Sequence, residues 1–416
     1  MIERLEIENF KSFRKLDLEL GRLNCFIGPN ACGKSNLIDA LAFLQQCVSD
    51  SVTTAFDDRG GYAEVGHKGG AGQQEGARKG RSIGFLLRVA LDPLDPPLSL
   101  RLGERRRACA HAARLEYAGR LRHFHGQARV VEEQLGGEWR DEEGRTGAAM
   151  VFRRTGGSLR FCPGPWSDAW GQGREVVLPP DVEADRLLLG GSFGPPAARQ
   201  LASALQAWGF YDVQPEFVRY ALESDGVELD GSGANLAAVV GRLWRSRSKN
   251  ARWAREEILD GIRIGMRGLE RLETRRERDG GIMLWVRERG VRGPLSARCL
   301  SDGTIRLITY HVLAATTEPG PGVVCIEEPD RNLHPHLLEE LRDLLRTLSE
   351  RTQVIVTTHN PGLVDLLEPN EVFLMDKEGG RTRVMRAQEV EHIEAFRKDF
   401  SLGELWAQGA IGGVPE

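Results

Sequence analysis

The nine residues GPNACGKSN, at positions 28–36, decide the fold of this chain. They follow the apolar run LNCFI at 23–27, which has the length and composition of a buried strand. Apolar residues then recur at helical spacing, at Leu37, Ile38, Leu41 and Leu44. The order therefore predicts a strand, a glycine-rich loop and a helix over residues 22–48.

The loop matches the pattern G-x-x-x-x-G-K-[ST] of phosphate-binding loops, in the strand-to-helix setting that the pattern requires. Its glycines allow backbone N–H groups to surround phosphate oxygens, and the helix N-terminus adds a favourable dipole. We expect Lys34 to reach the β- and γ-phosphates and the Ser35 hydroxyl to bind Mg²⁺. An ordinary glycine-rich turn is the alternative, and the complete motif disfavours it. The residues expected to hold the nucleotide are Gly28, Pro29, Asn30, Ala31, Cys32, Gly33, Lys34, Ser35 and Asn36.

A second informative stretch, CIEEPDRNLHPH at 325–336, places four potential metal ligands after a buried strand. These are Glu327, Glu328, His334 and His336. Beside a phosphate loop, two carboxylates on a neighbouring strand suit phosphoryl transfer, with Glu327 directed to the metal and Glu328 acting as general base. A metal-hydrolase site and a surface acid pair are the alternatives.

Two further segments fit a nucleotide site. The strand-like QVIVTTHNP at 353–361 ends in His359, which is well placed to touch a γ-phosphate. LSDGT at 300–304 opens a helix, so Ser301 and Gly303 offer a hydroxyl and free N–H groups to an anion. Taken separately, these are a strand-end histidine and a good helix N-cap.

The remaining sequence divides by its periodicity. Residues 2–8 and 14–20 alternate as strands, 81–162 indicate a largely antiparallel β region, and 196 to about 275 show helical spacing up to Leu269. Residues 65–80 are rich in Gly and Gln, which is typical of an exposed loop. We expect an α/β fold with three units, an N-terminal part at 1–180, a helical insertion at 181–290 and a C-terminal part at 291–416.

The composition of the chain limits the cellular compartment and the kinds of partner that we expect. The net charge is −4, so bulk charge does not demand nucleic acid or a membrane. Seven cysteines without a C-x-x-C pair favour a reducing compartment. The charged N-terminus MIERLEIENF is no signal peptide, and no apolar run is long enough for a membrane helix. We expect a cytoplasmic protein without a membrane partner.

The motif order resembles the ABC-type ATPase heads of the SMC/RecF/OLD group, above all the stand-alone bacterial AAA-type ATPases related to them. NFKSF at 9–13 and GPNACGKSNLIDA at 28–40 resemble the first segment of an SMC head. LSDGT resembles the ABC signature LSGGQ, and IEEPDRNLHP resembles the Walker B and D-loop form IEEPE-x-x-LHP. His359 matches the switch histidine. The resemblance covers 1–50 and 293–376.

This resemblance implies ATP and Mg²⁺ as ligands and a P-loop ABC-type head with a mixed sheet. It implies head-to-tail dimers or higher oligomers, in which Ser301 and Gly303 of one subunit cap the γ-phosphate held by Lys34 of the other. His334 falls at the D-loop aspartate position and is expected at this interface. Glu327 stands where a Walker B aspartate is usual, so its contact with Mg²⁺ is expected to run through water.

The Q-loop of such heads has no clear counterpart, although Gln73, Gln74 and His67 fall in a suitable region. Cys32 lies in the phosphate loop beside Lys34, a setting that favours a reactive thiol. We therefore consider the hypothesis that alkylation of Cys32 blocks ATP binding. The alternative is that Cys32 is an unreactive small residue that only fills space in the loop.

Three kinds of ATPase compete. A transporter subunit is disfavoured because Lys34 and Ser301 are too far apart in sequence for that compact domain. A DNA-repair head is possible, since RLWRSRSKNARWAR at 242–255 has six basic residues, no acidic ones and two interleaved tryptophans, although a solvated helix face with buried tryptophans is favoured. The third is a nucleotide-gated scaffold for a separate effector such as a nuclease or toxin, as in anti-phage systems. No fused nuclease is expected, because no D-x-D follows His359, and His123 and His125 form only a lone H-x-H.

Overall fold

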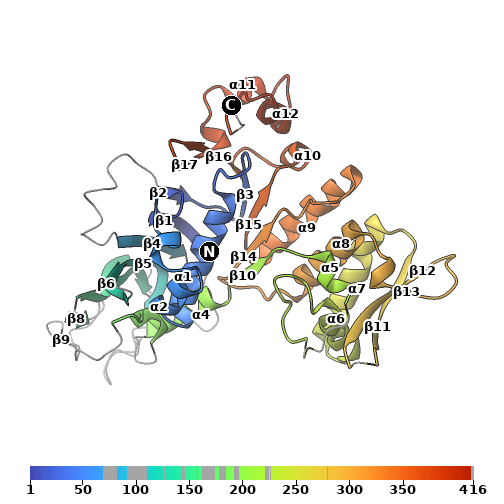
Figure 1. The fold of residues 1–416 in the computed structure, drawn as a ribbon, viewed down its shortest axis with the longest axis horizontal. Coiled ribbons are helices and arrows are strands. Elements are labelled where there is room, and N and C mark those ends of the chain that lie inside the picture. The colour runs from blue at the N-terminus through green and yellow to red at the C-terminus, as the bar shows by residue number, and fades with distance from the viewer. Residues whose placement is uncertain are drawn as a thin grey trace.

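The computed structural model describes most of the chain. The described residues are 1–68, 82–90, 110–124, 127–141, 146–156, 158–161, 174–177, 184–191, 196–220, 224, 226–278 and 280–413. The fold is α/β, with a mixed sheet, antiparallel sheets and covering helices (Figure 1), as the sequence predicted. Of the loop expected at 65–80, residues 69–80 lie outside the described residues.

The central sheet has six strands in the order β10-β14-β15-β3-β16-β17, all parallel except β17. Their bounds are β3 Leu23–Ile27, β10 Gly209–Tyr211, β14 Val323–Glu327, β15 Gln353–Thr358, β16 Val372–Glu378 and β17 Arg381–Arg386. Strands β3 and β15 are buried at every residue, which explains their continuous apolar composition. Strand β3, which leads into the phosphate loop, pairs on both sides with strands from the C-terminal part of the chain.

A second, antiparallel sheet of eight strands occupies the N-terminal part, in the order β2-β1-β4-β5-β6-β7-β8-β9. The bounds are β1 Ile2–Phe10, β2 Phe13–Glu19, β4 Ser82–Ala90, β5 Ala110–Phe124, β6 Gln127–Asp141, β7 Thr146–Thr155, β8 Ser158–Phe161 and β9 Arg174–Val177. Alternation in β1 and β2 buries one face and leaves the other polar. The antiparallel β region predicted for 81–162 is thereby confirmed over the part of that range that the structure describes.

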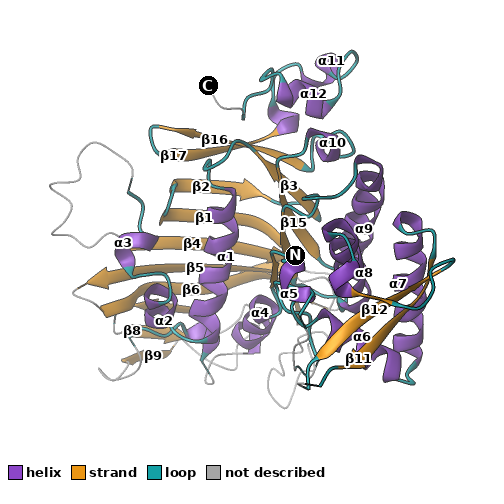
Figure 2. Ribbon diagram, turned by 45° about the vertical axis from the view of Figure 1, so that its right-hand side comes forward, coloured by secondary structure: helices purple, strands orange, loops and turns teal. Residues whose placement is uncertain are grey.

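Helix α1, Lys34–Ser49, lies between these two sheets (Figure 2). Short helices α2 Val52–Asp57, α3 Tyr62–Val65 and α4 Pro196–Gln206 complete this layer. On the other face of the central sheet lie α9 Leu338–Arg351, α10 Pro361–Val364, α11 Ile393–Phe396 and α12 Leu402–Ala407. The phosphate-loop helix is therefore fixed by packing on both sides.

Gln353 joins the two sheets. Its buried side-chain amide accepts from Ile2 N (2.8 Å) and donates to Ile2 O (2.8 Å) and Gly21 O (2.7 Å). One side chain thus satisfies backbone groups of the N-terminal segment from a strand near the other end of the sequence.

A distal lobe with its own core lies at one end of the molecule (Figure 1). It contains α5 Pro215–Val218, α6 Leu236–Arg245, α7 Lys249–Gly265, α8 Asp302–Thr316 and a three-stranded sheet of β11 Leu269–Arg276, β12 Ile282–Glu288 and β13 Leu295–Ser296. The helical prediction for 196–275 is wrong at β10, which pairs with β14, and over its last residues, because Leu269 begins β11. The insertion expected to be helical at 181–290 therefore contains both helices and strands. The spacing of Leu269 from Ile262 and Met266 fits a helix by chance, while the burial of Leu269 and Leu272 serves a strand.

Candidate nucleotide site

The phosphate loop needs its two outer glycines. Gly28 and Gly33 have φ of 157° and 119°, and Gly33 lies in the region that side chains avoid. A Cβ on Gly28 would meet the backbone of Met375, and one on Gly33 would come within 2.7 Å of Ser12 Oγ. Between them, Asn30 and Ala31 are exposed, and Ala31 has a φ of 62°. The glycines therefore permit a tight loop that presents its middle residues outward.

Lys34 is folded back onto the loop that carries it. Its Nζ donates to the carbonyl oxygens of Gly28 (2.7 Å) and Pro29 (2.9 Å) and lies 3.8 Å from the Cys32 sulfur. Burial of the side chain lowers the pKa of the Lys34 ammonium, and the neighbouring Cys32 opposes this shift. The cation thus stands inside the loop that the sequence assigned to phosphate binding.

A polar network that no local motif predicted supports the loop from behind. Thr382 of β17 is buried, and its Oγ1 donates to the Cys32 carbonyl oxygen and lies 2.7 Å from Ser12 Oγ. Asn36 donates its side-chain amide to the same Ser12 Oγ at 2.8 Å. Asn36, expected among the nucleotide contacts, is turned to this network, and Thr382 had no signal because it lies 350 residues beyond Cys32.

The parallel strands of the central sheet bring the hydroxyl group of Ser35 and the carboxylate of Glu327 together. Ser35 Oγ donates to Glu327 Oε2 at 2.7 Å, across 292 positions of sequence. Burial raises the pKa of the Glu327 carboxyl, and the Ser35 hydrogen bond opposes that shift. The loop residue expected to bind metal is therefore in direct contact with the carboxylate expected to do the same.

Glu328 diverges from Glu327 because its backbone has a φ of 43°, in the left-handed region. Its Oε1 lies 3.4 Å from His359 Nε2, and its Oε2 accepts from Arg331 Nε (3.0 Å) and Nη2 (2.6 Å). Burial and the nearby Lys34 cation lower the pKa of His359. The sequence-predicted base and switch histidine are thus paired, and Arg331 is an additional partner.

The segment after Glu328 is hydrogen-bonded to β15, the strand that leads to the switch histidine. Asp330 is buried and accepts from Thr358 Oγ1 at 2.6 Å, while burial raises the pKa of its carboxyl. His334 and His336 lie side by side, with their Nδ1 atoms 2.7 Å apart. Within the described residues, no group of three His, Cys, Asp or Glu side chains could hold a metal ion, so the metal-hydrolase alternative has no support there.

The signature-like segment LSDGT caps its own helix. Ser301 is exposed and accepts from Thr304 N at 3.1 Å as the N-cap of α8. Asp302 accepts from Arg219 Nη2 (2.5 Å) and from Asn332 Nδ2 (3.2 Å). A Cβ on Gly303 would come within 2.7 Å of the Asn332 carbonyl oxygen, so glycine is needed for this close approach.

The central sheet places one further polar residue, Asp212, at the site, and sequence reasoning missed it. Strand β10 pairs with β14, with Tyr211 opposite Ile326, so Asp212 follows at the same sheet edge as Glu327. Gln214 comes two residues later, at the start of α5. Of the Q-loop candidates, Gln73 and Gln74 lie outside the described residues, and His67 is buried with its Nδ1 2.7 Å from the Lys11 carbonyl oxygen. Only the strand order, invisible in sequence, identifies the neighbour of β14.

The structure also bears on two minor expectations, which concern the H-x-H pair and membrane helices. His123 packs its ring against Tyr62, with centroids 6.0 Å apart, and His125 lies outside the described residues. The helices that are described include none with the length and apolar composition to cross a membrane.

Two family models match the chain. Residues 1–65 match the model described as "AAA ATPase domain", and residues 198–365 match "AAA domain, putative AbiEii toxin, Type IV TA system". The first match contains the phosphate loop, and the second contains the signature-like segment, Glu327, Glu328 and His359.

Curated relatives match over a short segment. The chromosome partition protein Smc of Methanocaldococcus jannaschii is 46% identical over 44 residues, which are 10% of this chain and 4% of that protein. The DNA replication and repair protein RecF of Phocaeicola vulgatus is 42% identical over 50 residues, 12% of this chain and 14% of that protein. The chain therefore spans a small part of the length of these relatives.

A solved structure, an SMC head bound to the C-winged helix domain of ScpA, superposes with a TM-score of 0.51 and 13% identity. The match covers 92% of this chain and 97% of that one. At this identity the match concerns the fold alone, and it extends over the distal lobe as well as the two sheets. With AAA-type ATPase segments that include the phosphate loop and the Walker B strand, and with the fold of an SMC head, the chain is an SMC/RecF-like member of the AAA-type ATPases.

Proposed function

We propose that this protein binds Mg²⁺-ATP and hydrolyses it in a site completed by a second copy of the chain. The observation that carries the proposal is the 2.7 Å hydrogen bond from Ser35 to Glu327, beside the 3.4 Å pair of His359 and Glu328. The Ser35–Glu327 hydrogen bond joins the phosphate loop to the acidic end of β14. Phosphoryl transfer requires a phosphate-binding loop and metal-binding carboxylates at one place. Relatives with AAA ATPase domains support hydrolysis at the level of the family.

The donor set suits Mg²⁺. Ser35 and Glu327 offer a hydroxyl and a carboxylate oxygen, and Mg²⁺ in such sites commonly takes one or two protein oxygens and completes its shell with phosphates and water. Mg²⁺ bound there would neutralise charge on the phosphates. Lys34 would move from the Gly28 and Pro29 carbonyl oxygens to the phosphates, and Glu328 would accept the proton of the attacking water.

A second copy of the chain would supply the contacts to the γ-phosphate that Ser301 and Gly303 do not make at the phosphate loop of their own chain. Ser301 is exposed and bonds within its own helix, and the segment that carries it belongs to the distal lobe. In a head-to-tail dimer, Ser301 and the N–H groups near Gly303 would meet the γ-phosphate held by the partner's Lys34. His334 would lie at this interface. ATP would favour closure because Ser301 contacts the γ-phosphate only in the closed state.

The output of closure is proposed to be the gating of a separate effector, such as a nuclease or toxin, in anti-phage defence in the cytoplasm. The match of residues 198–365 to a model described with a putative toxin supports this direction. The fold also matches an SMC head that was solved with a bound partner domain. A second candidate, a DNA-binding ATPase of the RecF type, is favoured by the exposed basic residues of the stretch at 242–255.

The test is the Glu328→Gln variant. It should bind ATP and hydrolyse it about 10²–10⁴-fold more slowly, because the positioned base is lost. Light scattering should then show a dimer that requires ATP and Mg²⁺. Ser301→Arg in the same background is the control, since it should restore the monomer and leave nucleotide affinity unchanged. A Glu328→Gln protein that stays monomeric with saturating ATP would exclude the shared site.

A further inference from the structure

The side chain of Arg331 holds the carboxylate that the proposed mechanism uses as its base. Glu328 Oε2 accepts hydrogen bonds from Arg331 Nε (3.0 Å) and Nη2 (2.6 Å). Each bond occupies a lone pair of this oxygen, which leaves little of its acceptor capacity for an attacking water. The other oxygen, Oε1, faces His359 Nε2 at 3.4 Å. In the single chain, both oxygens of the base therefore already face another side chain.

The pair of Arg331 and Glu328 is built into a tight turn. Arg331 N donates to the Glu328 carbonyl oxygen at 3.1 Å. Glu328 and Asn332, at the two ends of the turn, have φ of 43° and 61°, in the left-handed region. Asp330, in the middle of the turn, is buried and accepts from Thr358 of β15. The turn is therefore held to the central sheet at Asp330, while Arg331 and Asn332 are exposed.

Asn332 connects the same turn to the signature-like segment. Its Nδ2 donates to Asp302 Oδ2 at 3.2 Å. A Cβ on Gly303 would come within 2.7 Å of the Asn332 carbonyl oxygen, so the two backbones are in close contact. Because Asn332 directly follows Arg331, a displacement of the signature-like segment is passed to Arg331 through the adjoining peptide bond.

The rest of α8 is anchored to α9. His311 Nε2 of α8 lies 3.0 Å from Glu340 Oε1 of α9. Arg351, at the end of α9, donates to the Ala314 carbonyl oxygen at 2.5 Å, and its guanidinium lies 4.8 Å from the ring centroid of Trp253. Trp253 is 53% exposed, so the expectation that it is buried is wrong. With α8 anchored here, a shift of the segment that opens it is taken up at the turn rather than by the whole lobe.

A second carboxylate lies beside the turn. Asp212 follows β10 and lies at the sheet edge next to Glu327. The hydrogen bond to Glu328 raises the pKa of Arg331, and the Asp212 charge adds to this shift. A guanidinium released from Glu328 therefore keeps an anionic neighbour.

We propose that Arg331 restrains the general base in the single chain and that the second copy releases it. The inference rests on the proposed function. When Ser301 meets the γ-phosphate bound by the partner, the signature-like segment shifts against Asn332. Arg331 then leaves Glu328 for Asp212, and Glu328 Oε2 becomes free to accept a proton from water. The restraint keeps hydrolysis low until both copies are in place.

The experiment measures steady-state ATP hydrolysis by the full-length protein in the Ser301→Arg background, which is expected to be monomeric. Adding Arg331→Ala should raise kcat about tenfold and leave KM unchanged, because the freed carboxylate regains part of the contribution of a positioned base. Arg331→Lys should give a smaller increase, since an ammonium can still donate to Glu328. An arginine that only stabilised the fold would not raise kcat when removed.

A second measurement tests the connection through the turn, with Ser301 intact. Asn332→Gly keeps the positive φ and removes the side-chain contact to Asp302. The variant should hydrolyse ATP about tenfold more slowly than wild type, because Arg331 is no longer withdrawn from the base. Light scattering with Glu328→Gln added should still show the ATP-dependent dimer. Adding Arg331→Ala to Asn332→Gly should restore the rate.

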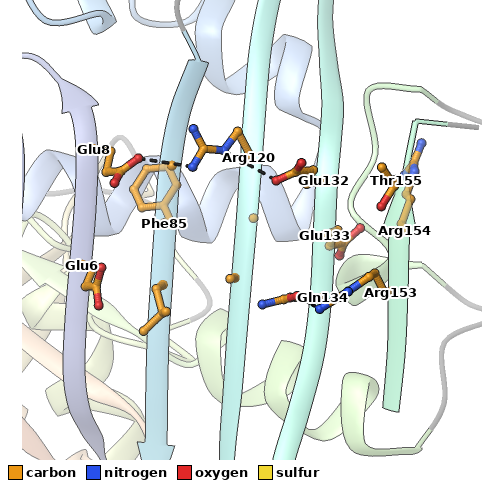
Figure 3. A pocket seen from close by; sticks show the side chains of 14 residues that line it. Glu6, Glu8, Phe85, Arg120, Glu132, Glu133, Gln134, Arg153, Arg154 and Thr155 are labelled. Carbon is orange, nitrogen blue, oxygen red and sulfur yellow. Dashed lines mark hydrogen bonds and ion pairs between the residues drawn. The ribbon is translucent and has the colours of Figure 1, made fainter. Parts of the chain in front are cut away.

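The matched control is Arg120→Ala, on the outer face of the eight-stranded sheet (Figure 3). Arg120 lies 3.4 Å from Glu8 and 3.7 Å from Glu132, beside a groove of about 360 Å³. Its side chain is 42% exposed, against 45% for Arg331, so the control removes a comparable ion pair outside the nucleotide site. It should change kcat less than about twofold in the Ser301→Arg background.

Three results would overturn the restraint. They are an unchanged or lower kcat for Arg331→Ala, an equal increase in the Arg120→Ala control, or an Asn332→Gly dimer that hydrolyses ATP at the wild-type rate. A Ser301→Arg protein that is as fast as wild type would instead overturn the shared site on which the inference rests.

Discussion

The two halves of the proposed ATP site are built differently. The phosphate-loop half is fastened from all sides, with Ser35 bonded to Glu327 and Thr382 bonded to the Cys32 backbone. The signature half presents Ser301 at the surface, and Asp302 ties it to Arg219 and Asn332. The first half is therefore held together within a single chain, whereas the second leaves Ser301 exposed, as the proposed dimer requires.

This difference predicts that substitutions in the two halves have separable effects. Changes in the phosphate-loop half should alter nucleotide affinity in the monomer. Changes in the signature half should leave that affinity intact and alter hydrolysis, because in the proposed mechanism only hydrolysis requires the second copy.

The largest effect is expected for Lys34→Ala. Loss of a charge-assisted contact of about 3 kcal/mol corresponds to a fall in ATP affinity of about 100-fold or more. Titration calorimetry measures this, with Lys15→Ala as the control for loss of a lysine outside the site. Unchanged affinity in the Lys34 variant would remove the phosphate-loop assignment and with it the comparison of the two halves.

An intermediate effect is expected for Asp302→Ala. Nucleotide affinity should be unchanged and hydrolysis should fall about tenfold, since the variant frees the signature segment from Arg219 and Asn332 and disturbs its positioning. Asp302→Asn, which can still accept one hydrogen bond, should recover part of the rate. A loss of ATP affinity in a calorimetric titration would show that the halves are not separable.

The same contact has a pH dependence of known sign. The Arg219 guanidinium holds the pKa of the Asp302 carboxyl below its usual value. A depressed pKa means that the folded state favours the ionised form, so this stabilisation is present above the ordinary aspartate range and is lost as the pH falls through the depressed value. The rate advantage of wild type over Asp302→Ala should shrink over that acidic range.

The smallest effect is expected at Cys32. Its side chain is 1% exposed and packs against Gly28, so the structure favours the small-residue role over the reactive thiol considered from sequence. Alkylating reagent should label the exposed Cys299 and spare Cys32 in the folded protein. Mass spectrometry of the labelled peptides, with and without ATP, measures both. Labelling of Cys32 that ATP suppresses would reverse this assignment.

Local motifs carried most of what could be predicted. Gly33, Lys34 and Ser35 are identified by spacing within eight residues, and their strand-to-helix setting fixes the fold around them. Thr382 and Asp212 reach the site through strand order, which is a long-range property with no local pattern. Leu269 was assigned to a helix because its spacing from Ile262 and Met266 fits the helical period, and only its pairing and packing in the lobe show that it belongs to a strand.

The pairing of strand β3 has a consequence for how the protein folds during its synthesis. Both of its hydrogen-bonded neighbours, β15 and β16, begin at residue 353 or later, and Gln353 also holds Ile2. A ribosome therefore releases the phosphate loop long before the strands that shape it. The growing chain can complete much of its antiparallel sheet, but it carries an unpaired apolar strand until residues 353–378 have been made, a period in which chaperones protect such segments. ATP cannot stabilise the nascent chain before then, because its binding site needs β15 and β16 on either side of β3.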